Sequence, residues 1–335
     1  MPENPQNHLT PKVGSSDGLA GSFAKVAAVL AIAVAATLSL NFLVFFPYHL
    51  DIVTPPVIRK DSGDFYTKIY SKSVEASAEA PAKSESGGDN AGGYVSIAQR
   101  NVQLFHIKED IAKFVDRFQL QDKHVLDVGA GTGYLQDMVE DYVGLDISAS
   151  AGRYFHKPFV QASATEMPFR DGEFDVLWSI WVLEHVPKPE QALVEIRRVV
   201  KDGGILYLNP AWNCPPWIAQ GYPVRPYSDL GMRGKLIKAS LPLASPLRVA
   251  SLLGVRYVRQ QYARISSSPT RFHYNLLEPN YAHYWMSDSD ALNDLDLNEA
   301  LLWFTSRGDE CLNCDNGALL QFDELIIRVH KRTGA

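Results

Sequence analysis

Cysteine is scarce in this chain of 335 residues, which contains only three. Cys214, Cys311 and Cys314 are few and odd in number, so they do not form the disulfide framework of a small secreted domain, and a reducing compartment suits them better. No metal site is predicted, because Cys311 and Cys314 lack the second pair of ligands that structural zinc requires. Glycine (23) and proline (20) are too few for a fibrous or low-complexity protein.

Positive charge is not in excess either, since 32 Lys and Arg face 38 Asp and Glu, a net charge of -6. This balance argues against a general nucleic-acid binder, so no nucleic-acid partner is expected. The basic residues concentrate in one window, from Arg225 to Asn275, where nine of them accompany a single acid, Asp229. Two interpretations stay open for this window: a solvated basic face, or a contact surface for an anionic substrate or lipid headgroups.

Long hydrophobic runs are rare, and one stands out because Val26 to Phe46 contains no charged residue. A helix of this length spans about 31 Å, which matches the hydrocarbon core of a bilayer. We therefore predict a polar tail over residues 1–21 and a membrane anchor over residues 22–48. A cleaved signal peptide and a buried helix are the alternatives.

The segment from Ser71 to Gly93 is rich in Ser, Ala, Glu and Gly, which predicts a flexible linker, and the range 49–93 is expected to contain a juxtamembrane segment and this linker. Order is expected from residue 94, beginning with a helix over 96–118. Apolar runs and helical patterns then alternate, which predicts an α/β domain whose parallel sheet is covered on both faces. The expected strands are His124–Val128, Tyr142–Asp146, Pro158–Gln161, Phe174–Ile180, Gly204–Leu208 and Glu324–Val329, and the expected helices are Pro189–Val200 and Leu297–Ser306.

A glycine-rich turn follows the first of these strands, in the sequence VLDVGAGTG of Val125–Gly133. Glycines let the backbone bend sharply and approach a ligand, and a helix is expected to follow with its amides facing that ligand. Asp146 ends the next strand, where an acid can accept hydrogen bonds from a ribose. The spacing G-x-G-x-G and the nearby Asp127 disfavour a pyrophosphate and favour a cofactor with a positive charge, which suits S-adenosylmethionine.

This stretch and several later segments resemble the class I S-adenosylmethionine-dependent methyltransferases, most closely the small-molecule branch that includes quinone-biosynthesis enzymes. The resemblance extends from Lys123 to Asn209. It implies a Rossmann-like seven-stranded sheet with helices on both faces. The segments that carry it are Asp127–Gly133, Gly144–Ser148, Ala164–Phe169, Phe174–Leu177, Val182–Val186 and Arg197–Gly204.

The resemblance also implies roles for individual residues. Asp127 would serve the methionine amino group, Asp146 the ribose and Ile147 the adenine ring, with Ser163 and Ala164 at the adenine edge. His185 follows the fourth strand, where it is either a general base or a histidine that orders the loop. The full set of expected cofactor-binding residues is Asp127, Gly129, Ala130, Gly131, Gly133, Asp146, Ile147, Ser163 and Ala164.

Taken together, the sequence predicts a catalytic domain over 94–335 with a basic cap insertion at about 212–290. The expected function is that of a single-pass, membrane-anchored, S-adenosylmethionine-dependent methyltransferase whose catalytic domain faces the cytoplasm. Its partners would be the membrane, through residues 22–48, and a small-molecule or lipid-like methyl acceptor. The alternatives are a non-catalytic nucleoside-binding scaffold at a membrane and a nicotinamide-dependent oxidoreductase.

Overall fold

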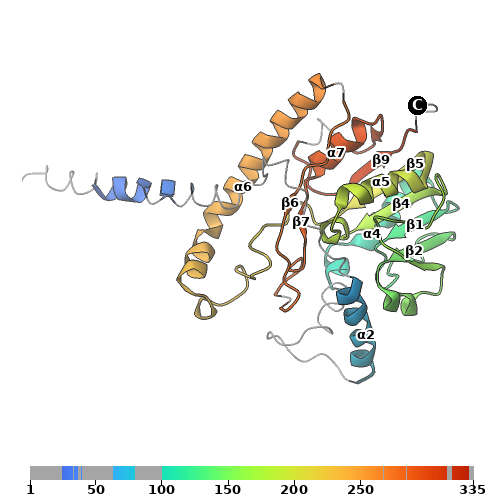
Figure 1. Ribbon diagram of the computed structural model, residues 1–335, viewed down its shortest axis with the longest axis horizontal. Coiled ribbons are helices and arrows are strands. Elements are labelled where there is room, and N and C mark those ends of the chain that lie inside the picture. Colours follow the sequence, from blue (N-terminus) through green and yellow to red (C-terminus); the bar gives the residue numbers. More distant parts are fainter. Residues whose placement is uncertain are drawn as a thin grey trace, which may run out of the picture. The chain divides into compact units, whose positions relative to one another are not determined.

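The computed structural model describes residues 25–32, 34–36, 39, 63–79, 100–266, 268–283, 285–314 and 319–331, with side chains only to residue 71 in the 63–79 segment (Figure 1). The chain divides into two units, residues 1–46 and 47–335, and each is described by itself. In the first unit, the described residues between Lys25 and Ala36 are helical and expose apolar side chains such as Leu30 and Ile32. The predicted tail lies outside the described residues, and the predicted anchor lies only partly within them.

One seven-stranded sheet forms the centre of the second unit, in the order β3-β2-β1-β4-β5-β9-β8. The first five strands of this order are parallel, β9 runs antiparallel to β5, and β8 runs antiparallel to β9. The predicted seven-stranded sheet is therefore confirmed, with an antiparallel edge. Its strands are β1 (Val125–Val128), β2 (Tyr142–Asp146), β3 (Phe159–Gln161), β4 (Phe174–Ile180), β5 (Val200–Asn209), β8 (Glu310–Cys311) and β9 (Leu325–Arg328).

Alternate residues of the strands supply two hydrophobic cores, one on each face of the sheet. On one face, Val125 and Val176 pack with Ile111 and Phe114 of helix α4 (Ile107–Phe118). On the other face, strand residues such as Leu126 pack with helices α5 (Pro189–Val199) and α7 (Leu297–Thr305). The central strands β1 and β4 are buried on both faces, as expected of parallel strands covered by helices.

Two helical predictions need correction. The helix expected over 96–118 is interrupted at His106, whose φ of 53° is left-handed, so that α4 begins only at Ile107. The glycine turn and the residues that follow it, up to residue 141, form turns and bends, and the expected helix is not formed there. The amides at the start of this segment are used locally, since Gly133 N–H donates to the Ala130 carbonyl and Gln136 N–H to the Gly133 carbonyl.

The range 49–93, predicted to be a juxtamembrane segment and a flexible linker, contains helix α2 (Gly63–Glu79), so the linker predicted from Ser71 is wrong for residues 71–79. This helix packs on the 3-10 helix η1 (Ala149–Tyr154), where the Ser150 hydroxyl donates to the Thr67 carbonyl at 2.7 Å. Tyr66 and Ile69 are buried by that contact. The folded unit thus includes residues well before the predicted boundary at 94, and the rest of the linker range lies outside the described residues.

The long helix α6 (Met232–Ile265) carries most of the basic window, and three of its seven cations pair with acids. Arg256 is fully buried and bonds Asp296 at 2.9 Å, Arg259 bonds Glu299 at 2.7 Å, and Arg248 pairs with Asp294. These acids lie at or near the start of α7 and in β7 (Asn293–Asp294), which pairs with β6 (Asn275–Leu276). Part of the basic window therefore holds α6 against the domain through these ion pairs, and part of it is a solvated surface.

The structure joins Cys311 and Cys314 in a disulfide bond, contrary to the expectation drawn from the sparse cysteines. The two half-cystines close a short loop directly after β8. Asn313 inside this loop donates to the Glu324 carbonyl and accepts from Ile326 N–H, at 2.9 Å each. The bridge therefore belongs to the sheet edge, while Cys214 is a buried free thiol.

Candidate cofactor and acceptor site

The candidate site lies at the carboxyl ends of β1, β2 and β4. The strand order reverses between β1 and β4, because β2 and β3 lie on one side of β1 and β4 and β5 on the other. In open α/β sheets ligands bind in the crevice beside such a reversal. The glycine turn and Asp146 both fall at this crevice, as the sequence predicts.

The glycine turn is held tightly against the neighbouring strands. Gly129 and Ala130 N–H both donate to the Leu145 carbonyl, at 2.7 and 2.9 Å. Gly129 has a φ of +77°, and a Cβ there would lie 2.1 Å from a methyl carbon of Val182. Only glycine fits this position, on grounds of both conformation and space.

Asp146 closes the turn from the end of β2. Its carboxylate accepts hydrogen bonds from Gly131 N–H at 2.9 Å and from Ser148 N–H at 2.8 Å. Burial raises the pKa of Asp146, although these backbone donors oppose the rise. One donor fixes each oxygen, and each oxygen keeps a further lone pair for a ligand hydroxyl.

Asp127 lies at the same crevice and is 5% exposed. The Tyr142 hydroxyl donates to its carboxylate at 2.8 Å. Burial raises the pKa of Asp127 to about 7, against the lowering effect of hydrogen bonds from Tyr142 and Trp178. A cation placed beside Asp127 would stabilise its ionised form.

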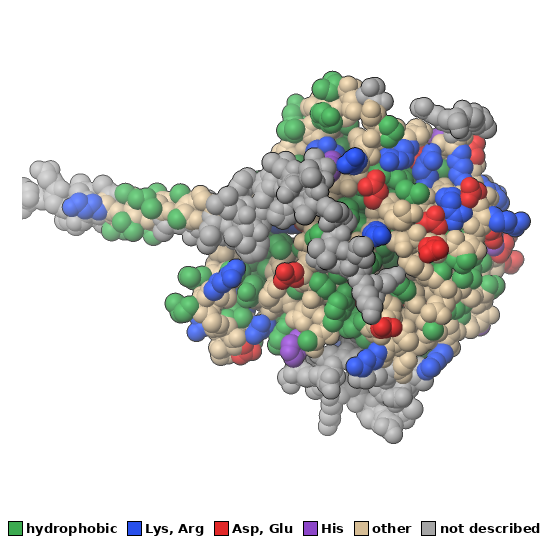
Figure 2. Space-filling model, viewed as in Figure 1, with side chains coloured by type: hydrophobic (Ala, Val, Ile, Leu, Met, Phe, Trp, Pro, Cys, Tyr) green, Lys and Arg blue, Asp and Glu red, His purple; other side chains and the backbone are tan. Residues whose placement is uncertain are grey.

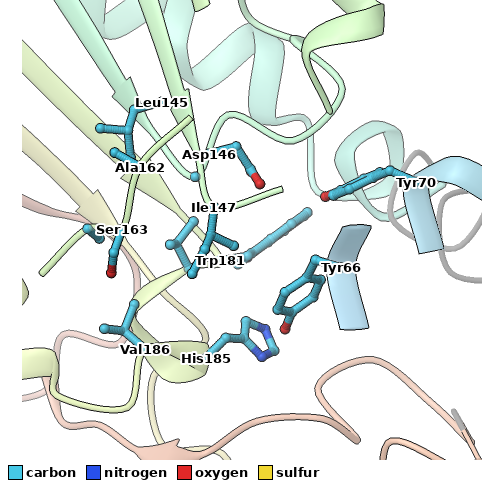
Figure 3. Close-up of a pocket in the computed structure, with 13 residues that line it drawn as sticks. Tyr66, Tyr70, Leu145, Asp146, Ile147, Ala162, Ser163, Trp181, His185 and Val186 are labelled. Carbon is cyan, nitrogen blue, oxygen red and sulfur yellow. The ribbon is translucent and has the colours of Figure 1, made fainter. Parts of the chain in front are cut away.

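Two adjoining cavities meet at this point. The smaller, of about 80 Å³, contains most of the predicted adenosine side of the site (Figure 3). A larger one of about 660 Å³ adjoins it and shares Tyr70, Gly129, Trp181 and His185. Of the predicted residues, Gly129, Asp146, Ile147, Ser163, Ala164 and His185 line the smaller cavity, and Asp127, Gly129, Ala130, Gly131 and His185 line the larger one. Gly133 lies in the turn but is not among the residues lining these two cavities.

Sequence reasoning missed the two tyrosines of α2, which cover the pocket (Figure 3). The Tyr70 hydroxyl lies 3.1 Å from where a Cβ of Gly131 would be, and Tyr66 packs edge-on against the His185 ring at 6.1 Å between ring centroids. Phe65, Tyr66, Ile69 and Tyr70 do follow a helical spacing, which is the signal that could have identified α2.

The second set of missed residues surrounds His185 in the 3-10 helix η2 (Leu183–His185). The imidazole lies near three acids: Glu184 beside it, and Asp288 and Asp290 from the cap. Burial lowers the pKa of His185, but the three carboxylates outweigh it and raise the pKa overall. Burial raises the pKa of Glu184 to about 7.

The comparisons with known proteins point to this same region. Residues 126–208 match the family profile described as a methyltransferase domain. An uncharacterized methyltransferase of Mycobacterium tuberculosis is 36% identical over 96 residues, which cover 25% of this chain and 38% of that protein. A ubiquinone/menaquinone biosynthesis C-methyltransferase of Hahella chejuensis is 33% identical over 132 residues, covering 34% of this chain and 53% of that protein. The chain thus spans about half or less of the curated relatives it matches.

Solved structures match part of the chain as well. The YcgJ protein of Bacillus subtilis is 16% identical and covers 58% of this chain and 65% of its own, with a TM-score of 0.33. A SAM-dependent methyltransferase of Aquifex aeolicus is 23% identical and covers 31% and 65%, with a TM-score of 0.28. The profile match and the motifs agree over residues 126–208, which are similar to a methyltransferase domain and support the resemblance to class I S-adenosylmethionine-dependent methyltransferases.

Proposed function

We propose that this protein is a membrane-associated methyltransferase that uses S-adenosylmethionine and acts on a small-molecule or lipid-like acceptor. The observation that carries the cofactor assignment is the pairing of two buried carboxylates, Asp127 and Asp146, on either side of the glycine turn. They fit a ligand with a ribose at one end and an ammonium group at the other. Bound there, the cofactor would supply an electrophilic methyl group.

The chain's own residues then have distinct tasks. Asp146 would hold the ribose hydroxyls, with its carboxylate already oriented by two backbone donors. Asp127 would hold the ammonium group. Ile147, Ser163 and Ala164 line the smaller cavity and would contact the adenine. Methyl transfer from a sulfonium depends mainly on positioning, which such a set of contacts provides.

The larger cavity is the proposed place of the acceptor, because it adjoins the cofactor pocket at His185. The neighbouring carboxylates raise the pKa of His185, which makes the imidazole less suited to act as a general base. We therefore favour an orienting role for His185. Neither the scaffold nor the oxidoreductase alternative has better support, since the glycine spacing and Asp127 suit a positively charged cofactor.

The lipid-like nature of the acceptor is supported by α6. By length and composition, α6 is the one helix in the described part of the chain that could cross a membrane, and these two properties alone are weak evidence for a span. The buried ion pairs between α6 and the domain argue against a span. Its other side exposes apolar side chains (Figure 2). We name this surface the outer face of α6 and define it by Met232, Leu236, Leu243, Leu247, Val258, Tyr262 and Ile265. Such a face suits contact with the bilayer interface, from which an amphiphilic acceptor would be taken.

The membrane anchor over residues 22–48 is supported by the uncharged run from Val26 to Phe46 and by the exposed apolar helix between Lys25 and Ala36. We place the catalytic domain in the cytoplasm, where S-adenosylmethionine is made. Protease treatment of sealed, right-side-out vesicles should leave the domain intact. Digestion of the domain there would reverse the orientation.

The cofactor assignment is tested by calorimetry of the full chain in detergent with S-adenosylhomocysteine, NAD and NADP. Binding of S-adenosylhomocysteine alone supports the proposal, and binding of a dinucleotide alone overturns it. Labelled-methyl transfer into a lipid extract and an aqueous extract then separates an enzyme from a scaffold. Label in the lipid fraction supports a lipid-like acceptor, and label only in the aqueous fraction contradicts it.

The role of the outer face of α6 is tested with Leu236→Ser, Val258→Ser and Ile265→Ser combined. We expect turnover of vesicle-borne acceptor to fall at least fivefold while affinity for S-adenosylhomocysteine is unchanged. Leu320→Ser with Val194→Ser is the matched control, because both side chains are exposed and apolar but lie outside α6. Equal turnover in the triple variant and the control would show that the face has no part in acceptor uptake.

A further inference from the structure

Glu184, His185, Asp288 and Asp290 form a compact group, which we name the histidine–carboxylate cluster. One nitrogen of His185 and one oxygen each of Glu184 and Asp288 lie within 4.8 Å of one another. His185 Nε2 is 3.8 Å from Glu184 Oε1 and 4.0 Å from Asp288 Oδ1. An ion at the centre of such a triangle would lie about 2.5 Å from each donor, close to the distances at which divalent cations bind oxygen.

The cluster is short of positive charge. The side chains of Glu184 and Asp290 are fully buried, and His185 is the only cation paired with these acids among the residues that the structure describes. Glu184 Oε1 accepts from Ala211 N–H at 3.0 Å, whereas Glu184 Oε2 has no hydrogen-bond partner in the described part of the chain. A buried carboxylate oxygen without a donor is costly, and a cation bound by both oxygens of Glu184 would satisfy it.

His185 directs its two ring nitrogens toward different acids, and Nδ1 is not within hydrogen-bond distance of Asp290. Its Nε2 faces Glu184 and Asp288, while its Nδ1 lies 3.7 Å from Asp290 Oδ2. Asp290 is in turn fixed by the Tyr66 hydroxyl, which donates to Oδ2 at 2.8 Å. An outer carboxylate behind the second ring nitrogen sets the ring orientation and strengthens the ligating nitrogen in many metal sites.

We propose that Glu184, His185 and Asp288 bind a divalent cation of the Mn²⁺ type, with Asp290 as a positioning residue. One imidazole and two carboxylates are too hard a donor set for Cu(I), and the imidazole makes Mn²⁺ better suited than Mg²⁺ or Ca²⁺. Asp288 and His185 line the larger cavity, so the open coordination positions would face the proposed acceptor. The binding of the ion is independent of the proposed methyl transfer, whereas its contact with an oxygen-bearing acceptor rests on that function.

The test uses the full chain, stripped of metal with a chelator and titrated with Mn²⁺, and follows the loss of the free-ion signal by electron paramagnetic resonance. We expect one bound equivalent, with affinity reduced at least tenfold by Asp288→Asn and less by Asp290→Asn. Asp323→Asn is the matched control, because Asp323 lines the same cavity outside the cluster and should leave Mn²⁺ affinity unchanged. Cooperative thermal unfolding and S-adenosylhomocysteine binding report whether each variant is folded.

Absence of Mn²⁺ binding by a wild-type chain that binds S-adenosylhomocysteine would overturn the metal site and leave the cofactor assignment standing. Equal Mn²⁺ affinity in Asp288→Asn and Asp323→Asn would also overturn it. Identification of a cationic amine as the methylated product, with no Mn²⁺ bound, would assign the cluster to the acceptor's own charge.

Discussion

The crevice at the carboxyl ends of β1, β2 and β4 differs from the cap that carries α6 in how buried charge is compensated. At the crevice, the hydrogen bonds to Asp127 and Asp146 within the described part of the chain come from neutral groups, so a ligand with a positive charge would complement these carboxylates. In the cap, Arg256 and Asp296 are buried together and neutralise each other. A buried charge without an internal counter-ion indicates a binding function. A buried ion pair indicates a structural contact, here between α6 and the rest of the domain.

Among the variants that test this comparison, we expect the largest loss of free energy of unfolding for one in the cap. Arg256→Ala leaves Asp296 buried without its partner and removes the bonds that Arg256 donates to the Leu319 and Gln321 carbonyls. Breaking one side of a buried pair costs about 3–5 kcal/mol. We expect that loss in the free energy of unfolding, measured by urea denaturation. Arg264→Ala, at an exposed residue of the same helix, should change it by about 0.5 kcal/mol or less. Similar values for both variants would contradict the structural role of the ion pair.

At the crevice, Asp146→Asn should act on binding and only weakly on stability. The amide keeps one acceptor oxygen but replaces the other with a donor, which faces a backbone N–H. We expect the affinity for S-adenosylhomocysteine to fall about 30-fold, or about 2 kcal/mol. Isothermal titration calorimetry measures this directly. An unchanged affinity would remove Asp146 from the proposed ribose contact.

The pH dependence of binding tests Asp127. Because its pKa is about 7, roughly one Asp127 in ten is ionised at pH 6 and nine in ten at pH 8. A ligand ammonium favours the ionised form, so affinity for S-adenosylhomocysteine should rise about tenfold from pH 6 to pH 8. In Asp127→Asn most of that rise should disappear. An identical pH profile in the variant would show that Asp127 does not meet the ammonium group.

The smallest effect concerns the contact between α2 and the cap. Tyr66→Phe removes one hydrogen bond to Asp290 and keeps the packing of the ring against His185. We expect about 1 kcal/mol less stability, because a buried carboxylate loses one of its donors. Differential scanning calorimetry with Tyr227→Phe as the exposed control measures the change. No difference between the two would mean that the Tyr66 bond contributes nothing to closing the pocket.

Six strands of the sheet could be predicted because they are short apolar runs between turn residues, as in Val125–Val128 and Phe174–Ile180, whereas the two-residue strand β8 has no such pattern. The glycine turn and Asp146 could be predicted because their roles depend on neighbours in sequence. The cap contacts could not, since Asp288 and Asp290 reach His185 only through the fold and no local pattern connects them. For α2, the small polar residues after Ser71 outweighed the aromatic spacing before it. Gly129 shows a further limit: the motif predicts its flexibility, but only the structure shows Val182 against it, so Gly129→Val would disturb packing as well as ligand binding.

The position of Tyr70 over the glycine turn has a consequence for the timing of turnover. Ligand pockets usually need about 300–1,000 Å³, and the smaller cavity offers about 80 Å³. For the proposed nucleoside to occupy the smaller cavity, α2 has to shift away from it, both when the nucleoside binds and when it leaves. The observed association rate should then reach a plateau at high ligand concentration, set by the opening rate of α2. The release of the nucleoside product should be limited by the same opening rate.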